Sequence, residues 1–369
     1  MNTSHTETPR PKPTVVDVAI AADVAVGTVS RVLNTPELVG ADIRQRVIEA
    51  VERLEYSPLR RRRRRIDRSR QRAAHRGNVG VLFLGTADTQ AEMPVFAEAL
   101  RGMERLVASG NENLMRANIP AADRIPLFMA RDLIDGLILR APVAGDFREC
   151  ASPEMIDAIE RVPHVWLVTR PDTARGDLVG PDQEAACVLA TDYLMRKGHR
   201  RVEFFDPMPA RANALDPAQV FSLIASRRGL GVRVMQSARN GSARWPVSTR
   251  TTQEQLAPLL DEWLALPGDD RPTTIVVPDD EVAFQLYAGF QGRGQTVGRD
   301  ISVFSLRQER GLVAGILPRL ASIDIQGEEI GRRAIDQLRW RLERPGDRPA
   351  VSIGVRPKLV EGDSVAILS

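Results

Sequence analysis

The sequence predicts two folded parts, a small all-α domain of the helix-turn-helix type and a larger two-lobed α/β domain with parallel sheets. Three observations lead to this fold class. Residues 14–56 contain three short stretches in which apolar residues recur at helical spacing. An arginine-rich segment follows at 59–77, and from residue 78 short apolar runs alternate with amphipathic segments. The length of 369 residues also favours two or three domains over one core.

The first and third predicted helices of the small domain have recognisable end signals. The first covers residues 15–22 and begins after Thr14 as N-cap, with Asp17 three residues later in a capping-box arrangement. The third covers about residues 43–54 and carries Arg53 near its end, as the helix dipole favours.

The second predicted helix, residues 26–33, is short and has two different faces. Val29, Val32 and Leu33 would point inward. The outward positions are Val26, Gly27, Ser30 and Arg31. Two short helices joined by a tight turn and closed by a third form a helix-turn-helix, whose second helix can lie in a DNA major groove. A small helical domain that binds another protein is the alternative interpretation.

The arginines beside these helices favour DNA. Arg60 to Arg65 are consecutive, and the arginines that follow are Arg68, Arg70, Arg72 and Arg76. Residues 1–76 hold 16 basic and 9 acidic side chains, a net charge of +7, whereas the rest of the chain holds 35 and 39, a net charge of −4. Such a block cannot be buried, and phosphates would neutralise it. A solvated linker in an arginine-rich chain is the alternative.

Composition argues against a membrane protein, a secreted protein and a metal-binding protein. No window approaches the ~18 uninterrupted apolar residues that a membrane span needs. Residues 1–13 are polar and proline-rich, which predicts a disordered leader and no signal peptide. Cys150 and Cys187 lack metal-ligand or CxxC spacing. We therefore expect a cytoplasmic protein with no cofactor and no metal site.

From residue 78 onward, the chain predicts two successive series of strands and helices. Apolar strands of the first series are NVGVLFLG, DGLILRA and HVWLVTR, and those of the second are GHRRVEFFD, TTIVVPDD and DISVFSL. Two series of similar size indicate two lobes, with ligands at the carboxyl ends of the strands. We expect the first lobe to contain residues 78–177 and 308–345, and the second to contain residues 178–307 and 346–369.

The segment DVAIAADVAVGTVSRVLN, residues 17–34, resembles the N-terminal signature of the LacI/GalR family of bacterial transcription regulators. The matching residues are Asp17, Val18, Ala19, Ala22, Val24, Thr28, Val29, Ser30, Arg31, Val32, Leu33 and Asn34. The later segments DGLIL, GHRRV and DISV also stand where the family has landmarks. The resemblance implies a lambda-repressor-like helix-turn-helix domain at 14–58, a hinge at 59–77, and a periplasmic-binding-protein-like effector-binding and dimerisation domain at 78–369.

The resemblance also implies which residues contact DNA. At the two positions that most often select bases in the family, this chain has Val26 and Gly27. Since Gly27 has no side chain, Val26 would contact a thymine methyl group and Arg31 a guanine. Thr14 is expected at the same interface. The expected phosphate contacts are Thr28, Ser30, Asn34 and Tyr56.

Two residues depart from the family within the motif. Asp23 stands where the family has a turn glycine, and aspartate tolerates a left-handed conformation better than most residues. Ala25 replaces the usual Ser or Thr, which removes a side-chain cap worth roughly 1 kcal/mol.

The linker departs further, since the family's hinge becomes a short helix on DNA and inserts a leucine into the minor groove. Arg62 and Arg65 occupy the positions of the usual alanine and leucine, and Arg63 matches. We expect this segment to be disordered without DNA and to fold when phosphates screen the arginines. Leu59 or Ile66 would then be the wedge, or the arginines would enter a narrow groove without intercalation.

For the effector site, the resemblance points to Arg170, Asp279, Asp280 and Arg307. The two aspartates follow a strand, where sugar or nucleoside hydroxyl binding is favoured over paired-carboxylate hydrolysis, and Asp280 could also cap the next helix. Arg307 stands where the family has an acid, so the effector would be a sugar or an anionic metabolite, or the site binds none. His199 is expected to be a packing residue and no catalytic base.

These observations lead to one main functional hypothesis. The chain would be a dimeric, sequence-specific DNA-binding regulator, by family habit a repressor, acting on a pseudo-palindromic operator under control of a small-molecule effector. The alternative is an effector-independent or nucleoid-associated DNA-binding protein with a degenerate ligand pocket. An enzyme is not expected, because the sequence has no nucleophile elbow, phosphate loop or metal-ligand cluster.

Overall fold

The computed structural model describes most of the chain and divides it into two compact units. The units are Met1–Ala74 and His75–Ser369, and each is described by itself. The described ranges are 13–34, 39–54, 77–87, 94–142, 144–208, 216–237, 244–248, 250–268, 270–308, 315–344, 346 and 349–368. The expected leader and hinge lie outside these ranges, apart from Pro13 and Gly77.

The first unit contains three helices, as predicted. They are α1 (Val15–Ala21), α2 (Val26–Asn34) and α3 (Ala41–Arg53). The capping box before α1 is confirmed: the Asp17 amide donates to Thr14 Oγ1 at 3.4 Å, and the Thr14 amide donates to Asp17 Oδ2 at 2.6 Å. Its small core draws on all three helices, and the buried side chains are Val18, Ala19, Ala22, Val29, Val32, Val47 and Ala50.

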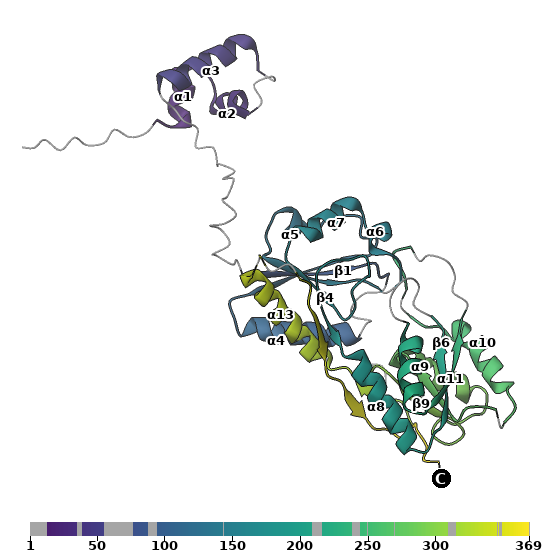
Figure 1. Ribbon diagram of the computed structural model, residues 1–369. Helices are drawn as coiled ribbons and strands as arrows, with labels where there is room; N and C mark the ends of the chain where they lie inside the picture. Colours follow the sequence, from purple (N-terminus) through teal and green to yellow (C-terminus); the bar gives the residue numbers. More distant parts are fainter. Residues whose placement is uncertain are drawn as a thin grey trace, which may run out of the picture. The chain divides into compact units, whose positions relative to one another are not determined.

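The second unit is built on two six-stranded sheets (Figure 1). The first is parallel and has the order β11-β5-β4-β3-β1-β2. Its strands are β1 (Asn78–Leu84), β2 (Asn113–Ile119), β3 (Gly136–Arg140), β4 (His164–Leu167), β5 (Asp177–Pro181) and β11 (Ser352–Val355). The parallel pairing explains why these strands read as apolar runs, since helices cover both faces.

The second sheet repeats this plan with the order β12-β10-β9-β8-β6-β7, and only β12 runs antiparallel to its neighbour. Its strands are β6 (Arg201–Asp206), β7 (Gly231–Gln236), β8 (Thr274–Val277), β9 (Ser302–Ser305), β10 (Ala321–Asp324) and β12 (Lys358–Val360). Within each lobe the first five strands therefore follow the order 2-1-3-4-5. In such sheets, ligands bind beyond the carboxyl ends of the first and third strands.

Helices flank both sheets. On the first sheet, α4 (Pro94–Ala108) and α13 (Gly327–Glu343) pack together on one face, opposite a second helical layer. That layer consists of α5 (Leu127–Ala130), α6 (Phe147–Cys150) and α7 (Pro153–Glu160). The helices of the second lobe are α8 (Gln183–Arg196), α9 (Pro217–Arg227), α10 (Gln253–Leu264) and α11 (Asp280–Gln291). No helix in the described ranges is long and apolar enough to cross a membrane.

The last part of the chain crosses between the lobes more often than the sequence suggested. Residues 308–345 were expected in the first lobe, but β10 completes the parallel run of the second sheet beside β9. Residues 346–369 were expected in the second lobe, yet β11 pairs with β5 in the first sheet. Short strands of this kind carry little periodicity of their own, and long-range pairing decides which sheet they join.

Candidate functional site: a helix-turn-helix surface and the edge between two lobes

The exposed face of α2 carries the residues predicted to contact DNA. Val29 and Val32 are buried against the other helices, while Gly27, Ser30 and Arg31 are exposed. Val26 is 42% exposed, so its side chain is accessible at the surface of α2. The sequence correctly predicted which residues of α2 face inward and which face solvent.

Arg46 of α3 holds the turn before this surface. Its guanidinium donates to the Ala22 carbonyl at 2.6 Å and to the Asp23 carbonyl at 2.8 Å, so it satisfies acceptors left at the end of α1. Asp23 adopts a φ of 52°, the left-handed conformation that the family's glycine would take. The substitution Gly to Asp is thus accommodated in the turn. Ala25, just before α2, has no side chain that could cap the helix.

Gly27 is not required by the fold. A Cβ added there would meet nothing within 4 Å, and its backbone has no unusual dihedral. The Thr14 hydroxyl is committed to the capping box with Asp17. Thr28, another predicted contact, is half-buried on α2. The other predicted contacts lie outside what the structure describes, and they are the Asn34 side chain, Tyr56, Arg62, Arg63 and Arg65.

In the second unit, the predicted effector residues Asp279 and Arg307 meet at the carboxyl ends of β8 and β9. Arg307 Nη2 donates to Asp279 Oδ2 at 2.8 Å, and the Asp280 amide donates to the Arg307 carbonyl at 3.1 Å. Asp279 Oδ1 also accepts from the Val282 amide, so Asp279 is the N-cap of α11. The expectation that Asp280 caps this helix is wrong, because Asp280 is its first residue and is fully buried.

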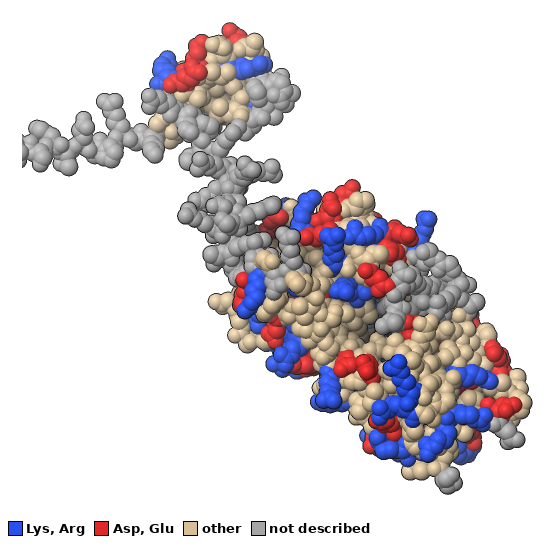
Figure 2. Space-filling model, in the orientation of Figure 1, with Lys and Arg blue, Asp and Glu red and all other residues tan. Residues whose placement is uncertain are grey.

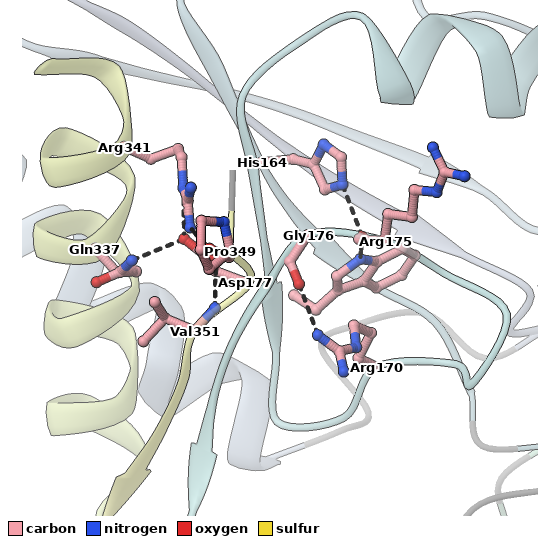
Figure 3. Close-up of polar contacts among 10 residues, drawn as sticks. His164, Arg170, Arg175, Gly176, Asp177, Gln337, Arg341, Pro349 and Val351 are labelled. Atoms are coloured by element: carbon pink, nitrogen blue, oxygen red, sulfur yellow. Dashed lines mark hydrogen bonds and ion pairs between the residues drawn. The ribbon is translucent and has the colours of Figure 1, made fainter. Parts of the chain in front are cut away.

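Arg170, the fourth predicted effector residue, is bound within its own loop after β4. Its Nη1 donates to the Gly176 carbonyl at 2.7 Å (Figure 3). The same loop is held by Trp166 Nε1 and His164 Nε2, which both lie within hydrogen-bond distance of the Arg175 carbonyl. The contacts of Arg170 thus support the loop and do not join it to Asp279 and Arg307.

Sequence reasoning missed Arg140, the last residue of β3. This arginine is 9% exposed, its Nη1 donates to Thr169 Oγ1 at 3.0 Å, and its guanidinium carbon lies 4.6 Å from the centre of the Phe96 ring. Its Nε has no hydrogen-bond partner among the described residues. Burial, and to a lesser degree the nearby Arg307, lower the pKa of Arg140 to about 9, so it stays protonated at neutral pH. The missed signal was a lone arginine ending the apolar run DGLILR.

Asp206, the last residue of β6, is the acidic counterpart in the second lobe. It is 3% exposed and accepts a hydrogen bond from the Met208 amide at 3.0 Å. Burial and the neighbouring charges of Asp216 and Asp279 raise the pKa of the Asp206 carboxyl to about 6. We call the group Arg140, Asp206, Asp279 and Arg307 the interlobe site. Charged groups gathered at the carboxyl ends of parallel strands are typical of ligand sites.

A strap from the second lobe, residues 244–248, reaches the first lobe near this edge. Trp245 Nε1 donates to the Ala144 carbonyl at 2.8 Å, and the Trp245 ring packs against Phe147 at 6.3 Å between ring centres. Val247 forms a bridge with Thr86, just after β1. The strap therefore adds an aromatic anchor between the lobes that the sequence did not reveal.

His199 is a packing residue, as predicted. Its ring is fully buried, with Nδ1 2.8 Å from Thr273 Oγ1 and Nε2 3.1 Å from the Ala366 carbonyl. Burial lowers the pKa of His199 from its usual value. Over the described part of the chain, no three His, Cys, Asp or Glu side chains are grouped as metal ligands.

Models of known protein families match both units. Residues 14–58 match the model described as bacterial regulatory proteins of the lacI family, and residues 191–365 match that of a periplasmic binding protein-like domain. A helix-turn-helix joined to a two-lobed domain of this type defines a DNA-binding transcriptional regulator. The chain therefore carries a helix-turn-helix domain of the lacI family together with a periplasmic binding protein-like domain.

Two curated relatives cover nearly the whole chain. The HTH-type transcriptional repressor PurR of Vibrio cholerae serotype O1 (strain M66-2) is 24% identical over 361 residues, which cover 96% of this chain and 99% of the relative. The ribose operon repressor of Haemophilus influenzae is 24% identical over 338 residues, which cover 90% and 93%. Both relatives are named as repressors, and neither as an enzyme.

Solved structures share the fold. The transcriptional regulator CelR in complex with cellobiose has a TM-score of 0.58 at 20% identity, covering 95% of this chain and 99% of that one. The lac repressor dimer bound to operator and the anti-inducer ONPF has a TM-score of 0.57 at 19% identity, covering 96% and 100%.

Proposed function

We propose that this regulator is a cytoplasmic dimeric repressor that binds a pseudo-palindromic operator and changes its affinity for DNA when a small polar effector binds between the lobes. The observation that supports it best is the exposed face of α2. Val26, Gly27 and Arg31 face solvent on a short helix whose opposite side is buried, and Arg46 fixes the turn that orients it. A two-fold dimer places two such helices on matching half-sites.

The distribution of charge agrees with this division of labour. Residues 1–76 carry a net charge of +7, while the remainder carries −4. In Figure 2, basic and acidic side chains are interspersed over the visible face of the two-lobed unit. Phosphate attraction would therefore come from the first unit and the arginine segment, and DNA affinity would fall steeply with salt.

The effector role is proposed for the interlobe site. Arg140 belongs to the first lobe and Asp206, Asp279 and Arg307 to the second, so a ligand that contacts both would favour one separation of the lobes over another. Named relatives and neighbours include a ribose operon repressor and a cellobiose complex, which supports a small polar ligand here as well. Coupling between ligand and DNA would be about 1–3 kcal/mol.

Selection of bound DNA from a random pool tests the DNA-binding part, with footprinting of the recovered sequences. We expect one palindromic protected sequence and, for Arg31→Ala, a relaxed preference at one base pair per half-site with about 1–3 kcal/mol weaker binding. Arg161→Ala is the matched control, because Arg161 is an exposed arginine of the two-lobed unit whose side chain is 75% accessible. Equal binding of every sequence would favour the nucleoid-associated alternative.

One observation favours effector-independent DNA binding as the second candidate. Arg307 and Asp279 pair with each other at 2.8 Å, so part of the interlobe site satisfies itself without a ligand. If operator binding stays unchanged across a broad panel of metabolites, including sugars, sugar acids and sugar phosphates, this second candidate replaces effector control.

A further inference from the structure

We propose that Arg140, with Thr169 and Phe96 beside it, binds an oxyanion, a carboxylate or phosphate group, on a polyhydroxylated effector. This inference rests on the proposed effector role of the interlobe site and specifies the chemistry of its ligand. It concerns the side of the site formed by the first lobe, where the sequence pointed to Arg170 and not to Arg140.

Arg140 has no carboxylate beside it among the described residues. An arginine that is 91% buried normally has a carboxylate beside it, because removing a guanidinium from water is costly. The described contacts of Arg140 are the Thr169 hydroxyl at 3.0 Å and the face of the Phe96 ring at 4.6 Å, and neither carries a negative charge. Arg307 nearby adds repulsion. A buried, protonated guanidinium with an unused Nε–H is a strong binding group for a planar or tetrahedral oxyanion.

A comparison with Arg341 shows what a structural arginine looks like in the same lobe. Arg341 Nε donates to Asp177 Oδ2 at 2.9 Å, and its Nη2 binds Asp177 Oδ1 and the Pro349 carbonyl. Its side chain is 13% exposed, so the two arginines are buried to a similar degree. The difference is that Arg341 has its counter-ion and the described residues supply none to Arg140.

The side of the interlobe site formed by the second lobe determines which other groups the ligand should carry. Asp206 and Asp279 are carboxylates, and carboxylates at such a site accept hydrogen bonds from hydroxyl groups. A ligand that fits both sides would place its acidic group toward Arg140 and its hydroxyl groups toward the second lobe. Sugar acids and sugar phosphates share this chemistry, whereas neutral sugars lack the acidic group.

The test measures thermal unfolding of the full-length chain without DNA, at constant ionic strength. The probes are inorganic phosphate and sulfate against chloride, followed by gluconate, glucuronate and glucose 6-phosphate against glucose. We expect the oxyanions to raise the melting temperature of the two-lobed unit by several degrees relative to chloride. Among the larger probes, a response to the sugar acids alone would identify the group as a carboxylate, and a response to glucose 6-phosphate alone would identify it as a phosphate.

Two variants separate binding from structural support. Arg140→Met keeps the aliphatic stem beside Phe96 and removes the charge, so the ligand-free protein should melt at the same or a higher temperature. The oxyanion response should disappear, with affinity at least tenfold weaker. Arg341→Met is the matched control, and it should lower the melting temperature while any anion response of the folded protein remains.

Either of two results overturns the inference. The first is an Arg140→Met protein that melts several degrees lower, which would make Arg140 a structural ion. The second is a wild-type chain that no oxyanion stabilises beyond chloride, or an anion response that survives Arg140→Met. Because no DNA is present, these failures leave the proposed operator binding intact, and loss of operator selection would leave the anion result intact.

Discussion

Asp177 begins β5 and Asp206 ends β6, and the two carboxylates are buried to almost the same extent, at 1% and 3% exposed. Their surroundings differ. Asp177 accepts hydrogen bonds from Gln337 Nε2 at 2.7 Å, from the Val351 amide at 2.9 Å and from Arg341 (Figure 3). Asp206 has the Met208 amide and the Gln236 amide group as donors, but its charged neighbours are other aspartates.

The difference in neighbouring charges distinguishes a carboxylate that supports the fold from one that is available to a ligand. At the amino end of the first sheet, a carboxylate is matched by an arginine and ties α13 and β11 to β5. At the carboxyl ends that form the interlobe site, Asp206 and Arg140 each lack an opposite charge in direct contact among the described residues. Incomplete compensation lowers stability and is retained where a ligand supplies the missing partner.

The largest expected effect in this comparison is the loss of the Asp177 carboxylate. Asp177→Asn removes the carboxylate that Arg341 binds, and removing one partner of a buried ion pair costs about 3–5 kcal/mol. Chemical denaturation of the full chain should show this loss in the transition of the two-lobed unit. A loss of unfolding free energy below about 1 kcal/mol would contradict the comparison, because the charge of Asp177 would then be no better compensated than that of Asp206.

Replacing Asp206 by Asn should raise the free energy of unfolding, whereas Asp177→Asn lowers it. The pKa of Asp206 is about 6 in the folded chain and 3.8 ordinarily, so the unfolded chain releases this proton first as pH rises. Below pH 3.8 the carboxyl is protonated in both states and does not change the free energy of unfolding. Between pH 3.8 and 6 this free energy falls, and above pH 6 the ionised carboxylate lowers it by about 3 kcal/mol.

Asp206→Asn keeps an acceptor for the Met208 amide and removes this charge. The variant should therefore be more stable than wild type at pH 7.5, by up to about 3 kcal/mol, and the gain should vanish near pH 4. Denaturation curves at both pH values test this. Equal stability of the two proteins at pH 7.5 would show that the Asp206 charge is compensated after all.

The sequence predicted elements whose signals are local. Thr14 and Asp17 encode the capping box, Val29 and Val32 define the buried face of α2, and the α/β alternation predicted two parallel sheets with helices on both faces. The capping box and the buried face follow from residues within about four positions of one another, and each strand or helix of the alternation is recognised from its own short segment, so periodicity and capping rules suffice.

What the sequence did not show depends on residues far apart in the chain. Asp177 meets Gln337 and Arg341 across more than 150 positions, and Trp245 enters the first lobe from a segment between strands of the second. Arg140 and Arg307 come from different sheets and lie near enough for their charges to repel, and no local pattern reports that. Motif matching pointed to Asp279 and Arg307 but could not reveal that they bind each other.

The smallest expected effect extends the comparison to the DNA-binding surface. Gly27→Ala adds a methyl group where nothing lies within 4 Å and removes the conformational freedom of glycine near the start of α2, so it should stabilise the first unit by about 0.5–1 kcal/mol. Gly331→Ala is the matched control, because its Cβ would clash with the Ala99 backbone at the contact of α13 with α4 and should destabilise the second unit. Hydrogen exchange of α1–α3 amides measures the first effect, and DNA selection measures the altered base preference. Stabilisation with changed DNA selectivity would show that α2 resembles the interlobe site in one respect: the residues of both surfaces are determined by an external partner and not by packing. A Gly27→Ala protein with lower stability would instead show that the glycine serves the fold.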